Sequence, residues 1–124
     1  MCVNKPSENI TPFPDDPNNM LGSPLYIEDI RCQIEKDFGI AGFTFSGDEY
    51  TELASLLPEL LNEVTKLRTT RNSDWMKVVF RVDLTEKQYQ FVKKMGGDTH
   101  ENMAKAVLLR EFQKVHTRKQ YSRT

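Results

Sequence analysis

A helical pattern of apolar residues begins near residue 27. Ile27, Ile30, Ile34 and Phe38 follow one another at intervals of three or four residues, which places them on one face of a helix. Gly39 comes directly afterwards, where glycine commonly ends a helix. The pattern therefore predicts a short amphipathic helix with one buried face. It is followed by a predicted short extended piece, AGFTF.

A second helical pattern extends from Glu52 to Arg68. Its apolar positions, spaced four and three residues apart, are Leu53, Leu57, Leu60, Val64 and Leu67. Ser46 and Asp48 offer N-caps ahead of this stretch. Pro58 interrupts it, so we expect either a kink or two abutting helices. The spacing fits an amphipathic helix of the chain's own core, and it also fits an oligomerising helix.

Two segments lack apolar periodicity. Residues 1–24 contain five of the six prolines together with several Asn, Ser and Asp residues, so they are predicted to form a disordered leader. Residues 69–75, with the sequence TTRNSDW, follow the second helical pattern and are predicted to be a linker.

Beyond this linker the pattern changes to strict alternation. The residues of one face are Val78, Phe80, Val82 and Leu84, and those of the other are Lys77, Val79, Arg81 and Asp83. Valine and phenylalanine are also common in strands. The segment therefore predicts a β-strand with an apolar inner face and a polar outer face.

Two helices are predicted after this strand. Thr85 and Glu86 form a cap and an acidic first turn, and Gly96 and Gly97 end the first helix. Asp98 or Thr99 then caps a second, mostly apolar helix. The chain closes with a basic tail that contains arginine and lysine.

The predicted strand has no second strand in the chain with which to pair. Unpaired backbone donors and acceptors are costly, so the simplest arrangement is a second copy that supplies an antiparallel partner. In this order of elements, residues 77–114 resemble the ribbon-helix-helix family. The matching features are the strand KVVFRVDL, the L-T-E entry into a helix, the glycine turn and the helix MAKAVLLREF. The resemblance implies a homodimer whose helices cover a two-stranded ribbon.

The expected fold class is therefore α+β and mostly helical. The chain divides into a disordered leader over residues 1–24, an acidic helical segment over 25–72, a ribbon-helix-helix-like unit over 73–115 and a basic tail over 116–124.

The resemblance also implies sequence-specific binding to double-stranded DNA, as in a repressor or a plasmid or phage accessory protein. In this family the outer face of the ribbon enters the major groove, which gives Lys77, Val79 and Arg81 the base-facing positions. Of these, Arg81 is suited to a bidentate contact with guanine.

Contacts with the DNA backbone are assigned in the same way. The start of the family's second helix grips a phosphate, a role that falls here to Thr99 and His100. Lys93 and Lys94 would add contacts that do not depend on sequence.

Charge is divided unequally between the two halves of the chain. Residues 1–62 contain three basic and eleven acidic residues, whereas residues 63–124 contain fourteen basic and seven acidic residues. Such asymmetry is typical of proteins that bind nucleic acid, although the two halves could also simply attract each other. A second functional class therefore stays open: an antitoxin-like or adaptor protein that binds a protein partner through residues 25–68.

The sequence offers no catalytic constellation, so we expect no enzyme, no cofactor and no metal site. His100 and His116 lack neighbouring cysteines, and Gly96-Gly97 has no phosphate-loop motif around it. The two cysteines, Cys2 and Cys32, form neither a disulfide framework nor a zinc pair. No apolar run is long enough to cross a membrane. A cytoplasmic protein with no membrane partner is expected.

Overall fold

The computed structural model describes residues 17–47 and 49–122. The main helices are α1 (Pro17–Leu21), α2 (Ile27–Asp37), α3 (Leu57–Thr70), α4 (Asn72–Val82), α5 (Glu86–Lys93) and α6 (Thr99–Ser122), and two short 3₁₀ helices are η2 (Gly39–Ala41) and η3 (Leu53–Leu56). This part of the chain contains no β-strand. The expected α+β fold with a ribbon is therefore wrong, because the described fold is entirely helical.

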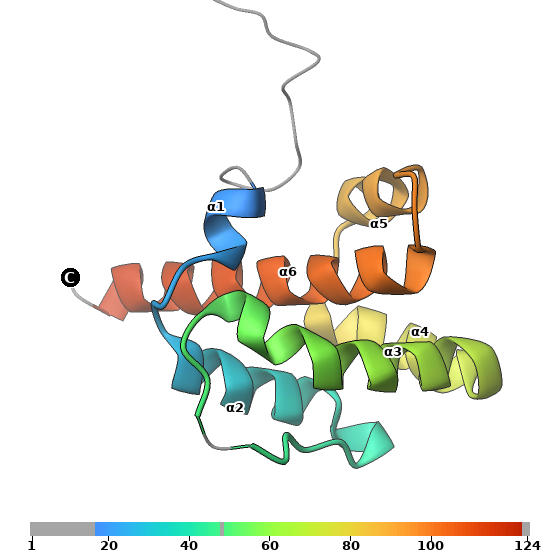
Figure 1. The fold of residues 1–124 in the computed structure, drawn as a ribbon, viewed down its shortest axis with the longest axis horizontal. Coiled ribbons are helices and arrows are strands. Elements are labelled where there is room, and N and C mark those ends of the chain that lie inside the picture. The colour runs from blue at the N-terminus through green and yellow to red at the C-terminus, as the bar shows by residue number, and fades with distance from the viewer. Residues whose placement is uncertain (1–16, 48, 123–124) are drawn as a thin grey trace, which may run out of the picture.

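Helix α6 is the centre of the fold. Figure 1 shows it crossing the molecule, with α1 and α5 on one side and α2, α3 and α4 on the other. A helix in this position needs apolar side chains on most of its surface, and α6 has them. Its buried apolar residues are Met103, Ala104, Ala106, Val107, Leu108, Leu109 and Val115. They form one core together with the inner faces of the surrounding helices.

The segment predicted as a strand is the helix α4. Its buried side chains are Trp75, Val78, Val79 and Val82, which are spaced three, one and three residues apart as on one face of a helix. The alternation of residues 77–84 also fits a strand, but this helical set has Trp75 as an additional anchor. Burial of the set against the core outweighs the strand preference of valine and phenylalanine. The ribbon-helix-helix interpretation of residues 77–114 is therefore corrected.

A left-handed residue ends α4. Asp83 has φ of 67°, and the backbone N–H groups of Asp83 and Leu84 both donate to the carbonyl of Val79, at 2.9 and 3.3 Å. Bonds of this kind close many helix C-termini, usually with Gly or Asn at the left-handed position. The position of Asp83, which looked like the outer face of a strand, is thus a helix cap.

The predicted linker over residues 69–75 is almost entirely helical. Helix α3 continues to Thr70 and α4 begins at Asn72, so that Arg71 alone separates them. Arg71 leaves the helical conformation, with φ of −140° and ψ of 58°. A single non-helical residue is enough to turn the chain, so α3 and α4 pack against each other.

The starts of α5 and α6 follow the sequence prediction. The backbone N–H of Gln88 donates to Thr85 Oγ1 at 3.1 Å, and the backbone N–H of Thr85 donates to Gln88 Oε1 at 3.0 Å. This reciprocal pair is a capping box. At the start of α6, the Asp98 carboxylate accepts the backbone N–H of His100 at 2.9 Å. Gly97, with φ of 89°, makes the turn between the two helices.

The first two predicted helices are also present. Helix α2 covers the predicted apolar pattern, and Pro58 lies in the first turn of α3, where proline is tolerated. The apolar seam of η3 and α3 is buried within the chain's own core at Leu53, Leu60, Val64 and Leu67. The AGFTF run is not a strand. The loop after it is held by Glu59, whose carboxylate accepts the backbone N–H of Ser46 at 2.7 Å.

The two ends of the chain are described only in part. Residues 1–16 of the predicted leader lie outside the described residues. From Pro17 onwards the chain forms α1, and Met20 is buried in the core. At the other end, α6 continues through the predicted basic tail as far as Ser122.

Candidate functional site

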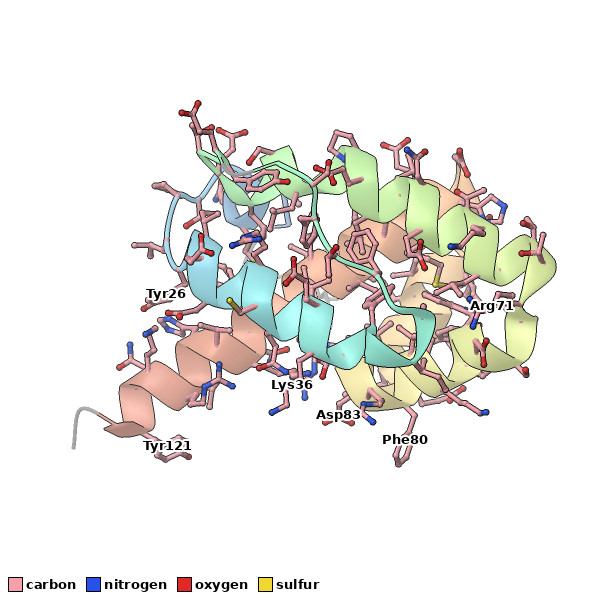
Figure 2. All side chains as sticks on the ribbon, turned by 90° about the horizontal axis from the view of Figure 1, so that it is seen from below. Tyr26, Lys36, Arg71, Phe80, Asp83 and Tyr121 are labelled. Carbon is pink, nitrogen blue, oxygen red and sulfur yellow. The ribbon has the colours of Figure 1, made fainter. Side chains whose placement is uncertain are left out.

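The outer surface of α4 carries the most exposed large apolar side chain of the described residues. Phe80 is 85% exposed, and Met76, one helical turn earlier, is 46% exposed. Figure 2 shows Phe80 projecting away from the body of the protein. Single exposed apolar residues are common, but two large ones on adjacent turns form a patch of the kind found at interaction sites.

Two cations flank this apolar pair. Lys77 and Arg81 each follow one of its members in the sequence, and both are exposed. Among the described residues neither side chain forms an ion pair. Their charges are therefore available to a partner. We refer to Met76, Lys77, Phe80 and Arg81 as the α4 face.

Two basic side chains of α6 fix the end of α4. Arg110 donates through Nε to the carbonyl of Asp83 at 2.8 Å and through Nη2 to its carboxylate at 3.0 Å. Lys114 Nζ donates to the carbonyls of Val82 at 3.1 Å and Arg81 at 3.3 Å. These bonds satisfy carbonyls that the last turn of a helix leaves free. These hydrogen bonds thus anchor the end of α4, and with it the α4 face, to α6.

A buried acidic pair lies behind this junction. Asp37 ends α2 and accepts a hydrogen bond from Lys114 at 2.7 Å, and the fully buried Glu111 has its Oε1 2.9 Å from the same ammonium group. Burial, together with the neighbouring Asp37 carboxyl, raises the pKa of Glu111 to about 9. Burial would also raise the pKa of Asp37. Hydrogen bonds from Glu111 and Lys114 outweigh it and lower that pKa below its usual range.

The residues assigned to DNA binding are not brought together. Lys77 and Arg81 are exposed on α4, whereas Val79 between them is buried. Lys93 and Lys94 are exposed at the end of α5. Figure 1 places α4 and α5 on opposite sides of α6, so these two pairs of cations belong to helices that α6 separates.

The predicted phosphate contact falls at the start of α6. Thr99 and His100 begin α6 as expected, but both are partly buried. His100 Nδ1 lies 2.9 Å from Nη1 of Arg68, and the carboxylate of Asp98 caps the backbone N–H of His100. The Asp98 carboxylate therefore already accepts one of the backbone N–H groups that were assigned to a phosphate.

Many basic side chains of the second half are engaged within the protein. Lys114 pairs with Asp37, and Lys119 Nζ is 2.8 Å from Oδ2 of Asp29, so both join α6 to the acidic half. Other cations of this half that form ion pairs are Lys66, Arg71, Lys105 and Arg110. Attraction between the two halves thus accounts for part of the charge division.

Comparisons with known proteins add no assignment. No protein-family model, curated protein or solved structure matches this chain. Over residues 17–47 and 49–122, no group of three or more His, Cys, Asp or Glu residues could hold a metal ion. The helices described for this chain include none that is long and apolar enough to span a membrane. Cys32 is a free, exposed thiol.

Sequence reasoning missed the α4 face because it placed Phe80 inside. In a strand, Phe80 and Val82 point to the same side, but in a helix they lie far apart around the axis. The usable signal is the spacing of Trp75, Val78, Val79 and Val82, which leaves Phe80 on the opposite side of a helix.

Proposed function

We propose that this protein is an adaptor that binds a partner protein through the α4 face. The observation that carries the proposal is the exposure of Phe80, with Met76 beside it. Aromatic side chains and methionine are enriched at the centres of protein interfaces, where a few buried anchors supply most of the binding energy. Phe80 would be such an anchor.

The partner we propose has an apolar pocket surrounded by acidic side chains. Lys77 and Arg81 flank Phe80 and are free of ion pairs within the described residues. Positive groups around an apolar centre speed association with a negatively charged surface and exclude partners of like charge. A second copy of the same face would set these cations against each other, so we propose a different protein as the partner.

Several observations favour a protein over double-stranded DNA. Binding to DNA depends mainly on many cations that meet phosphates. Here α6 uses Arg110, Lys114 and Lys119 for internal ion pairs, and the centre of the exposed surface is apolar. The acidic segment over residues 25–68 was the other candidate for binding a partner protein. Much of its apolar seam is buried in the chain's own core.

We also propose a cytoplasmic location for this adaptor. The exposed free thiol of Cys32 supports it, because reducing compartments keep surface thiols unpaired.

Selection of peptides from a phage-displayed random library tests the proposal. The full chain is the bait, and the affinity of the enriched peptides is then measured for the wild type and for Phe80→Ala. We expect acidic residues around an apolar one in these peptides. Phe80→Ala should cost about 2 kcal/mol, or roughly 30-fold in Kd, as loss of an interface anchor does. Lys77→Ala and Arg81→Ala should weaken binding less, and mainly at low salt.

Met95→Ala is the matched control, because Met95 is a partly exposed apolar residue beside α5. It should leave the affinity unchanged. Peptides that bind the wild type and Phe80→Ala equally well would contradict the proposal. Tight binding of a short DNA duplex with a steep dependence on salt, unaffected by Phe80→Ala, would favour nucleic acid instead.

A further inference from the structure

Three helices meet at a single ammonium group. Lys114 Nζ of α6 lies 2.7 Å from Oδ2 of Asp37 at the end of α2, and 3.1 and 3.3 Å from the carbonyls of Val82 and Arg81 at the end of α4. An ammonium group has three protons to donate. These three acceptor oxygens therefore take all three protons of the Lys114 ammonium group.

Glu111 is left without a donor at this junction. Its side chain is completely buried, and neither carboxyl oxygen accepts a well-formed hydrogen bond, although Lys114 Nζ is 2.9 Å from Oε1. An ionised carboxylate without hydrogen bonds in a protein interior is very costly. A neutral carboxylic acid avoids this cost, because it carries no charge and can donate its own proton.

The acceptor for that proton is Asp37. The two carboxyl groups lie beside the same ammonium group, since Lys114 Nζ is 2.7 Å from Asp37 Oδ2 and 2.9 Å from Glu111 Oε1, and Asp37 Oδ1 also accepts a hydrogen bond from Gln33 Nε2 at 3.1 Å. Asp37 is thus well supplied with donors as a carboxylate, whereas Glu111 has only its own proton to offer. The asymmetry places the negative charge on Asp37.

We propose that Glu111 is a neutral carboxylic acid in the folded protein, and that its proton closes the junction of α2, α4 and α6 as a pH-sensitive lock. Loss of the proton to solvent places two carboxylates beside a single ammonium group, which frees the ends of α2 and α4 from α6. The lock goes beyond the proposed binding to a partner and does not depend on it.

The pH range of the lock follows from the surrounding groups. The charged groups that act on Glu111 are Asp37 from α2 and Lys114 from its own helix, while α4 contributes the carbonyls of Arg81 and Val82. Burial and the neighbouring Asp37 carboxyl raise the pKa of Glu111 to about 9, against about 4.3 for an ordinary glutamate. Between these values the folded chain keeps a proton that the unfolded chain has released. Stability contributed by this proton is complete below about pH 4.3 and is lost as the pH rises towards 9.

The test combines an NMR titration of the Glu111 carboxyl carbon with urea unfolding of the full chain from pH 5 to pH 9.5. In the wild type the carboxyl carbon should stay at its neutral position well above pH 5, and the urea midpoint should fall steadily with pH. Exchange of the backbone amides at the end of α4, corrected for intrinsic rates, should accelerate near pH 9. Glu111→Gln keeps the shape and a donor for Asp37, so its midpoint should depend much less on pH.

Glu49→Gln, at an exposed carboxylate, is the matched control and should keep the wild-type pH profile. A Glu111 carboxyl that titrates near its ordinary pKa would overturn the proposal. Equal pH dependence of the wild type and Glu111→Gln would overturn it as well. The titration is done on the wild type, so the test holds even where Glu111→Gln folds poorly.

Discussion

Val82→Asp should unfold the protein at room temperature, whereas Phe80→Asp should leave it folded. Val82 is fully buried on the inner side of α4, and an unpaired carboxylate there costs several kcal/mol. That is comparable to the whole stability of a small domain, which is about 5–15 kcal/mol. Phe80 is 85% exposed, so its replacement should change the free energy of unfolding by only about 0.5 kcal/mol.

Circular dichroism with thermal unfolding measures this difference. The contrast depends on α4 being a helix, because a strand places residues 80 and 82 on the same side. If both variants unfold, or if both remain as stable as the wild type, the description of α4 is wrong.

Trp75→Ala should lower the free energy of unfolding by about 3–5 kcal/mol. Trp75 is the largest of the fully buried side chains, and its ring lies 6.0 Å from the guanidinium carbon of Arg68. Its removal leaves a cavity between α4 and the core. Urea unfolding followed by circular dichroism gives the value, with Met76→Ala at the neighbouring, partly exposed position as control.

The control should cost less than about 1 kcal/mol, because Met76 is already 46% exposed. In the wild type, fluorescence of Trp75, the only tryptophan, should report the same transition as circular dichroism. A loss below about 1 kcal/mol for Trp75→Ala would show that this residue is not part of the core.

The elements predicted correctly from sequence are those whose ends carry strong local signals. Helix α5 begins with the Thr85 cap and stops before the glycine pair, and α2 ends at Asp37, two residues before Gly39. Asp98 caps α6 as expected. In these places the local hydrogen bonds of the backbone fix the boundary, and no knowledge of the distant chain is needed.

The strand prediction failed because its residues fit two periods at once. Val78, Phe80 and Val82 alternate as in a strand, while Trp75, Val78, Val79 and Val82 repeat as in a helix. The choice is made by packing of α4 against α3, α2 and α6, which local sequence does not reveal. Because residues 69–75 were assigned to a linker, Trp75 was not counted with the apolar residues of the following segment.

The candidate site depended on this choice. Lys77 and Arg81 were singled out from sequence and are exposed, but the apolar centre between them, Phe80, was assigned to the interior. The lock at Glu111 was not predicted, because a single acidic residue in an apolar helix gives no sign of its partners. Its neighbours Asp37 and Lys114 are far apart in the sequence and meet only in the fold.

Residues 72–82 form a helix that presents Phe80 to solvent. NMR of the full chain tests it most directly, through ¹³Cα shifts along this segment and attenuation of the Phe80 ring signals by a soluble paramagnetic probe. We expect helical shifts from Asn72 to Val82 and strong attenuation at Phe80, with the signals of Trp75 and Val82 protected. Extended shifts over residues 77–84, with nuclear Overhauser effects to a second chain and a protected Phe80 ring, would contradict it.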